Sequence, residues 1–312
     1  MTPTLVAFVM LSAAMAFQRG VCGGKPDVIP YKTESVVYIR PRLSRRQYRQ
    51  LEPKVCGRVT GVASHVYYGE GAQRGDYPWM ALIKIPTIID GSQVIQGCGG
   101  TVISRYFVLT AAHCTQDHPV YGKIIVSVGD VDTESGNRLQ TYRVPYDHVT
   151  AHPGYRPDDQ TVKNDLALIR MDKPFNFSDH IRPICLPSSK LNLTDARADV
   201  AGWGISENSS DGSSRMQKGV VKVINEKCKH SFYNIDRRQI CAEVLPGESR
   251  TCMGDSGGPL MYRSPMDGRY YIVGIVSYGE DASCQDVILP DVFTRVSYYV
   301  DWIHSVVSRK HV

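Results

Sequence analysis

The stretch Gly254-Asp255-Ser256-Gly257-Gly258-Pro259 decides how this chain is interpreted. Glycines around a serine leave its hydroxyl group and the neighbouring backbone amides open to an incoming carbonyl group. A neutral serine hydroxyl is a poor nucleophile, so it needs a base within hydrogen-bond reach. The stretch therefore predicts a nucleophilic serine at position 256 if the chain also supplies a base and a group that orients it.

Two upstream segments supply these groups. Thr110-Ala111-Ala112-His113-Cys114 carries an imidazole, and Asn164-Asp165-Leu166-Ala167-Leu168 carries a carboxylate. Taken alone, the histidine would be interpreted as a structural residue, and the aspartate or the serine as an ordinary loop residue. Together, in the order His, Asp, Ser, they indicate a catalytic triad, which is recognised by its roles and context.

With these motifs, the chain from Val66 to its C-terminus resembles the chymotrypsin and trypsin family of serine peptidases. Subtilisins and α/β-hydrolases use other triad orders. The resemblance implies an all-β fold, with two antiparallel six-stranded β-barrels and a C-terminal helix. Apolar residues at helical spacing from Val296 to Val307 predict that helix. Short β-rich runs separated by turns predict strands at 102–109, 123–128, 165–171, 218–224 and 269–278.

The resemblance also implies a role for each site residue. His113 would take the proton of Ser256 and return it to the leaving amine, and Asp165 would hold the other ring N–H. Ser277 would hydrogen-bond the Asp165 carboxylate. The backbone amides of Gly254 and Ser256 would form the oxyanion hole.

The expected specificity pocket is atypical. Arg250 stands where trypsin-like relatives place an aspartate on the pocket floor, and Asp291 stands on the opposite wall in place of the usual glycine. Thr251 flanks the floor, and Gly279 is retained for backbone pairing with an extended substrate. Three interpretations stay open: an internal Arg–Asp pair with preference for small or apolar side chains, a basic side chain bound by the aspartate, or an acidic side chain bound by the arginine.

The domain organisation follows from the N-terminal composition. The apolar run that ends at Ala14-Met15-Ala16 is too short to span a membrane and is typical of a secretory signal, predicted over residues 1–16. A propeptide or light chain follows at 17–65, and the peptidase domain covers 66–312. The protein is therefore expected to be secreted and extracellular.

Activation is expected at an unusual site. In relatives, the new N-terminus inserts and its ammonium group pairs with the acid before the nucleophile, here Asp255. The matching tetrapeptide begins at Val66 and follows His65 rather than arginine or lysine. Cleavage after Arg58 is the alternative, but a chain starting at Val59 would be seven residues too long. Asp255 as a solvated surface acid is the remaining interpretation.

The chain has nine cysteines, and spacing alone does not determine their pairing. The resemblance implies Cys98 with Cys114, Cys228 with Cys241, Cys252 with Cys284, and a tether between Cys56 and Cys185. Cys22 is left over, and it could pair between molecules, remain free, or compete with Cys56. A further family bridge is missing, since Ala198 and Tyr262 stand near the places of its cysteines.

The remaining features assign no cofactor or metal. Asp130 is kept in a loop that resembles the calcium loop of the family. Arg138, however, falls near the position where a second acidic ligand is expected, so no metal site is expected. The arginine-rich stretch 40–49 is interpreted as a solvated, cleavable segment, with a polyanion-binding patch as the alternative. Glycosylation sequons begin at Asn176, Asn192 and Asn208.

These observations predict a secreted serine endopeptidase, made as a zymogen, that acts in a proteolytic cascade. Its expected partners are protein substrates, an activating protease and serpin-type inhibitors, with no nucleic acid and no membrane span. The rival hypothesis is a catalytically silent protease homologue that serves as a binding cofactor. The observation behind it is the atypical specificity pocket, which Arg250 and Asp291 would block.

Overall fold

The computed structural model describes residues 51, 54–60, 71–116, 121–134, 140–157, 162–187, 191, 193–204, 213–224, 228, 235–245, 255–279 and 290–309. All of them belong to one compact unit, Leu43–Val312. Several residues singled out in the sequence lie outside this described part: the segment 1–16, Cys22, His65, Val66, Arg138, Asn192, Asn208, Arg250, Thr251, Cys252, Gly254 and Cys284.

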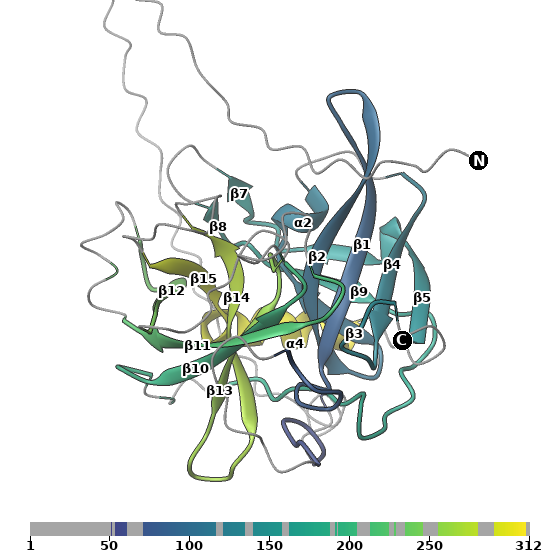
Figure 1. Ribbon diagram of the computed structural model, residues 1–312. Helices are drawn as coiled ribbons and strands as arrows, with labels where there is room; N and C mark the ends of the chain where they lie inside the picture. The colour runs from purple at the N-terminus through teal and green to yellow at the C-terminus, as the bar shows by residue number, and fades with distance from the viewer. Residues whose placement is uncertain are drawn as a thin grey trace, which may run out of the picture. The chain divides into compact units, whose positions relative to one another are not determined.

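The described residues form an all-β fold with one long C-terminal helix (Figure 1). In the N-terminal half the elements are β1 (Met80–Ile89), β2 (Ser92–Ser104), β3 (Phe107–Thr110), α2 (His113–Gln116), β4 (Lys123–Val128), β5 (Gln140–Pro145), η2 (Tyr146–His148), β6 (Val149–Ala151), β7 (Arg156–Pro157), β8 (Val162–Lys163) and β9 (Ala167–Arg170). In the C-terminal half they are β10 (Arg197–Gly202), β11 (Gln217–Val223), β12 (Gln239–Val244), β13 (Pro259–Arg263), β14 (Tyr270–Tyr278), β15 (Asp291–Arg295) and α4 (Val296–Arg309).

The C-terminal half forms a closed six-stranded barrel in the order β10-β11-β12-β15-β14-β13. The end of β11 alternates as expected for a strand with one face toward the core: Val221 and Val223 are buried, and Lys222 between them is half-buried. These valines pack with Ala198 and Val200 of β10 and Phe293 of β15 in the core of the barrel. The second predicted barrel is thus confirmed.

The N-terminal half is a seven-stranded antiparallel sheet in the order β5-β4-β1-β2-β3-β9-β6, where a closed six-stranded barrel was expected. Its two edge strands, β5 and β6, are separated in the chain only by the three residues of η2. The sheet must therefore curl until its edges approach one another, although they are not paired. Trp79 and Phe107 are fully buried in the large core beneath it.

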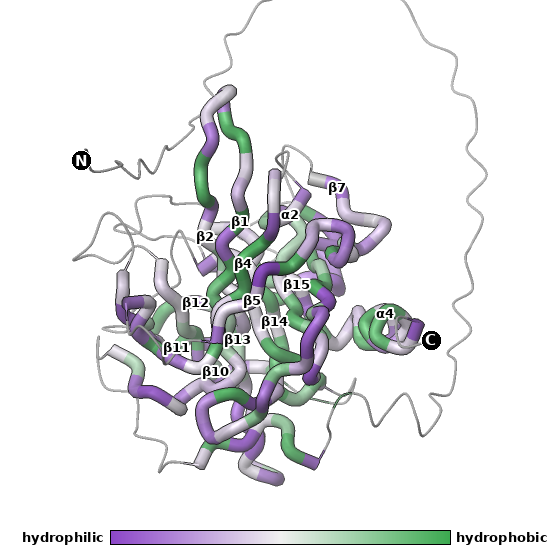
Figure 2. Tube along the Cα trace, turned by 90° about the vertical axis from the view of Figure 1, so that its right-hand side faces the viewer, coloured by the Kyte–Doolittle hydropathy of each residue, from purple (hydrophilic) through white to green (hydrophobic). Residues whose placement is uncertain are grey.

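The helix α4 closes the C-terminal end, as its apolar spacing predicted. Its buried residues include Val296, Tyr299, Ile303 and Val307, which recur at three- and four-residue intervals. Figure 2 shows the helix nearly end-on, with hydrophobic and hydrophilic sides. Within the described residues, no helix has the length and apolarity needed to cross a bilayer.

The apolar run 102–109 was predicted as one strand, and this is wrong. The chain turns at Arg105 and Tyr106, where the Ser104 hydroxyl accepts the Tyr106 backbone N–H at 3.3 Å. The two parts of the run pair with each other as β2 and β3. The polar residues in the middle of the run mark a turn because they interrupt the burial that a continuous strand would require.

Glycines allow the two halves of the fold to meet closely beside the Ser256 loop. A Cβ atom added at Gly99 in β2 would lie 2.8 Å from the Gly258 Cα and 2.9 Å from its nitrogen. Real Cβ atoms do not approach backbone atoms so closely, so a side chain at this position would push the two segments apart. The Gly99 N–H also donates to the Ser256 carbonyl oxygen at 2.8 Å.

We therefore expect Gly99→Ala to destabilise the fold by roughly 1–3 kcal/mol, the usual cost of forcing extra volume into a packed contact. Chemical denaturation measures this change in the free energy of unfolding. Gly97→Ala on the same strand is the matched control, because a Cβ atom at Gly97 meets no heavy atom within 4 Å. Equal stability of the two variants would contradict this account of the contact.

Candidate active site

The pairing of two strands brings His113 and Asp165 together. β3 and β9 run antiparallel with Thr110 opposite Ala167, so the residues after β3 and those before β9 lie at the same end of the sheet. His113 opens the short helix α2 after β3, and Asp165 lies two residues before β9. The sequence separation of 52 residues is thus closed by strand register.

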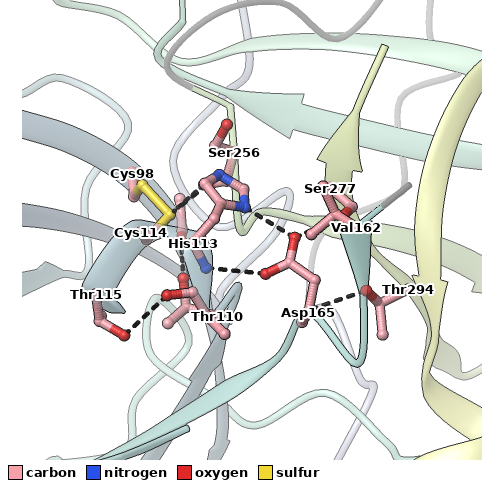
Figure 3. A network of polar contacts seen from close by, with 12 residues as sticks. Cys98, Thr110, His113, Cys114, Thr115, Val162, Asp165, Ser256, Ser277 and Thr294 are labelled. Atoms are coloured by element: carbon pink, nitrogen blue, oxygen red, sulfur yellow. Dashed lines mark hydrogen bonds and ion pairs between the residues drawn. A yellow bond between two sulfur atoms is a disulfide. The ribbon is translucent and has the colours of Figure 1, made fainter. Parts of the chain in front are cut away.

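Asp165 holds His113 through two hydrogen bonds. The His113 backbone N–H donates to Oδ1 at 2.9 Å, and the ring Nδ1 lies 2.8 Å from Oδ2. Because an ionised carboxylate only accepts hydrogen bonds, Nδ1 carries the proton and Nε2 presents its lone pair. Figure 3 shows Ser256 beside the imidazole, on the side of the ring away from Asp165.

The Asp165 carboxylate is fully buried and receives a third donor. The Ser277 hydroxyl donates to Oδ2 at 2.5 Å, and the Thr294 hydroxyl donates to the Asp165 backbone oxygen at 2.8 Å (Figure 3). Burial raises the pKa of the Asp165 carboxyl, but the charge of His113 and the hydrogen bonds from His113 and Ser277 outweigh it and hold the pKa below 3.8. The group therefore stays ionised at neutral pH.

The Ser256 loop is anchored to both halves of the fold. Its carbonyl oxygen accepts the Gly99 N–H, and the Gly99 oxygen in turn accepts the Thr110 hydroxyl at 2.8 Å. Gly257 adopts φ +79°, a conformation that favours glycine. Its N–H donates to the backbone oxygen of Val276 in β14 at 3.0 Å. These bonds determine where the serine lies relative to the imidazole.

A disulfide between Cys98 and Cys114 joins β2 to the helix that carries His113. The Cys114 sulfur lies 3.8 Å from His113 Nε2, and it also lies 3.6 Å from the Ser256 backbone oxygen. The two cysteine sulfurs and the histidine lie close enough together to resemble a metal site. The disulfide removes the thiolates that a metal would need, so this cluster is a covalent clamp.

The arrangement of His113, Asp165 and Ser256 agrees with the protein family that this chain matches. A family profile described as Trypsin matches residues 66–303. The chain belongs to the trypsin family. It is therefore a serine-type endopeptidase that acts on protein substrates.

Three relatives illustrate the trypsin-family match. A CLIP domain-containing serine protease of Bombyx mori is 35% identical over 81% of this chain and 71% of its own length. Phenoloxidase-activating factor 3 of Holotrichia diomphalia is 36% identical over 75% of this chain and 70% of its own. The clotting factor G beta subunit of Tachypleus tridentatus is 31% identical over 85% of this chain and 86% of its own.

In this trypsin-family chain, Asp255 is buried rather than solvated. Only 8% of the residue is exposed, and its Oδ1 accepts the Gly204 N–H at 3.0 Å. A Cβ atom at Gly202 would lie 1.7 Å from the same oxygen, so only glycine leaves room for the carboxylate there. The interpretation of Asp255 as a solvated surface acid is therefore wrong.

Of the residues predicted to form the specificity pocket, the structure describes Ser277, Gly279 and Asp291. Ser277 lies in β14 and contacts Asp165, and Gly279 is exposed directly after this strand. Asp291 is 7% exposed, opens β15 and lies opposite Ala242 of β12. Arg250, Thr251 and Gly254, which was predicted to contribute to the oxyanion hole, lie outside the described residues.

One disulfide holds the segment around Cys56 against the rest of the fold. Cys56 is bonded to Cys185, and Gly57 beside it donates to the Pro183 oxygen at 2.8 Å and accepts from Tyr270 N–H at 2.9 Å. Cys228 is bonded to Cys241. Cys185 therefore pairs with Cys56 and not with Cys22, and the expected Cys252–Cys284 bridge lies outside the described residues.

Packing occupies the place of the missing family bridge. Asp199 and Met261 are paired between β10 and β13, and their neighbours Ala198 and Tyr262 both belong to the core of the second barrel. Ala198 is buried, and Tyr262 packs against the same cluster. Both side chains thus contribute to one apolar cluster where a covalent bridge is missing.

Asp130 is engaged by the protein itself. Its Oδ1 accepts the Val131 N–H at 2.7 Å and the Asp132 N–H at 3.3 Å, and its Oδ2 lies 3.7 Å from the Arg74 guanidinium. A cation at this loop would have to compete with the arginine. Asn176, the first residue of one sequon, is exposed.

Three residues near the site were not assigned roles from the sequence. Gly99 and Thr110 position the Ser256 backbone, and Thr294 supports Asp165. Thr110 belongs to the histidine segment, so its proximity could have been noticed. Gly99 and Thr294 act through contacts between segments far apart in the chain, and no local pattern marks them.

Proposed function

We propose that the protein is a secreted zymogen whose triad is His113, Asp165 and Ser256 and which cleaves extracellular proteins by acyl transfer. The observation that carries the proposal is His113 held between the buried Asp165 carboxylate and Ser256. A silent binding homologue has no need for this arrangement, and nothing in the described residues favours that alternative.

In the proposed reaction, His113 Nε2 takes the hydroxyl proton as Ser256 attacks the scissile carbonyl carbon. The proton then moves to the leaving amine, the C–N bond breaks, and an acyl-enzyme ester remains on Ser256. Water attacks this ester with the same imidazole as base. The backbone amides of Gly254 and Ser256 stabilise the oxyanion, and one such donor typically contributes about 3 kcal/mol.

The proposed activation step is cleavage between His65 and Val66. The new ammonium group would pair with Asp255, whose buried carboxylate already lies against the Gly202–Gly204 segment. Cleavage after Arg58 is disfavoured because Val59 packs against the main core close to the bonded Cys56. The light chain, residues 17–65, stays attached through that disulfide.

We propose a shallow, nearly neutral specificity pocket in which Arg250 pairs with Asp291. Burial of Asp291 supports this pairing, because an unpaired buried charge costs several kcal/mol. Small or apolar side chains would then precede the cleaved bond. A basic or an acidic preference would indicate that one of the two charges binds substrate instead.

We also propose that the protein acts in a regulated extracellular cascade, under an activating protease and serpin-type inhibitors. The tethered light chain supports this role, as do relatives named as a phenoloxidase-activating factor and a clotting factor subunit. Segment 1–16 would direct secretion, and the exposed Asn176 would be a glycosylation site.

The test is N-terminal sequencing of the naturally activated protein, combined with fluorophosphonate labelling and a peptide-library profile. We expect one chain that begins at Val66, label on Ser256, and a defined preference for the residue before each cut. An activated protein that takes up no label and cuts no peptide would support the silent homologue. A chain that begins at Val59 would refute only the activation site.

A further inference from the structure

A second cavity lies in the C-terminal half, and its described lining includes neither His113 nor Ser256. Its volume is about 710 Å³, and β12, β15 and the start of α4 contribute to it. The charged residues of its described lining are Asp236, Arg237, Arg238 and Arg295. Three arginines against one aspartate leave an excess of two positive charges, and a concave surface of one sign concentrates ligands of the other.

Asp236 forms an ion pair with one of the three arginines, Arg238. Asp236 accepts from Arg238 Nε at 3.0 Å and 2.9 Å through its two oxygens. Arg237 is exposed, and its guanidinium lies over the ring of Tyr298 at 5.3 Å from the centroid. An anion bound here would therefore meet a guanidinium that Asp236 does not neutralise, beside an aromatic surface.

The third arginine, Arg295, is partly buried. Its Nε donates to the Gln239 backbone oxygen at 3.1 Å, and burial lowers the pKa of its guanidinium. A carboxylate in the cavity would match the planar donors of the guanidinium groups that line it.

The side chain of Gln239 links the cavity to the strand that is proposed to bind substrate. Gln239 lines the cavity, and its Nε2 donates to the Tyr278 hydroxyl at 3.1 Å. Tyr278 lies between Ser277, which contacts Asp165, and Gly279, which is proposed to pair with the substrate backbone. A substrate antiparallel to residues 277–279 has its C-terminal side near Ser277, so its upstream residues extend past Gly279.

We propose that this arginine cavity, lined by Arg237, Arg238 and Arg295, is an accessory site for acidic side chains of the polypeptide substrate. The acidic residues would lie several positions upstream of the cleaved bond. The inference rests on the proposed triad and on the substrate direction given above. Recognition of a folded substrate by such a site would add selectivity that a neutral specificity pocket does not supply.

The experiment compares two peptides that share one cleavage sequence taken from the library profile. One carries four glutamates upstream of it, and the other carries four glutamines. We expect the activated enzyme to prefer the glutamate peptide by roughly five-fold in kcat/KM at low salt, and the preference to fall as salt screens the charges. In Arg237→Glu the ratio should approach one. Arg143→Glu, the same charge change on the exposed side of β5, should retain the preference.

A fluorescent tetraglutamate peptide without a cleavage sequence provides a second readout, because anisotropy measures its binding without turnover. Absence of all Ser256-dependent cleavage would refute the proposed function, and the accessory site would then stand or fall on Arg237-dependent binding. Equal cleavage of both peptides by the unmodified enzyme would overturn the inference. So would a ratio of one together with Arg237-dependent binding of a sulfated polysaccharide, which would assign the cavity to that ligand instead.

Discussion

Replacing Ser256 by alanine should lower kcat by about 10⁶-fold, because the chain then lacks the atom that forms the acyl-enzyme. His113 and Asp165 cannot restore activity in this variant, because a base without a nucleophile cannot start the proposed reaction. A small residual rate over water is expected, because substrate binding and the oxyanion donors remain. Steady-state hydrolysis of the best library peptide by the activated variant measures the change.

Ser92→Ala is the control for this variant, because Ser92 is an exposed serine at the start of β2, directly after the turn of the β1–β2 hairpin. It should match the unmodified enzyme in both rate and thermal unfolding. Near-normal hydrolysis by Ser256→Ala would place the nucleophile elsewhere and would refute the proposed triad. An unchanged Tm in the inactive variant would show that the loss is chemical rather than structural.

Asp165→Asn should lower kcat by about 10⁴-fold, the loss typical of this change in a triad. Three donors converge on the carboxylate: the His113 backbone N–H, the His113 ring Nδ1–H and the Ser277 hydroxyl. An asparagine supplies one acceptor oxygen and an NH₂ group. If the NH₂ faces Nδ1, the imidazole proton must move to Nε2, and the ring can no longer accept the proton of Ser256.

The pH dependence gives this variant a second signature. Because the folded pKa of Asp165 lies below its ordinary value of 3.8, the carboxylate contributes stability that is present above the unfolded pKa and is lost as pH falls through the lowered folded pKa. Asp165→Asn removes that contribution, so the two proteins should differ in Tm at neutral pH and converge in acid. Asp301→Asn, an exposed acid on α4, should show neither effect. A variant with normal kcat would contradict the orienting role of Asp165.

The sequence predicted the candidate catalytic residues better than it predicted the strands. The segments around His113, Asp165 and Ser256 each have a local composition that is informative without any contact, and the helix from Val296 has a clear period. Short strands such as β12 were not predicted, because residues 239–242 are buried in succession and show no alternation. Burial on both faces of a strand is decided by packing against segments far away in the chain, which no local pattern specifies.

The sequence alone determined the residue types that can perform the reaction and their order along the chain. The tertiary structure decided their geometry: the β3–β9 register places His113 against Asp165, and the close approach of Gly99 to Gly258 places Ser256. It also decided that Cys56 pairs with Cys185, that Asp255 is buried, and that arginines from two segments far apart in the chain line one cavity. Distances between residues far apart in the chain depend on packing of the whole fold, whereas nucleophilicity and charge belong to the residues themselves.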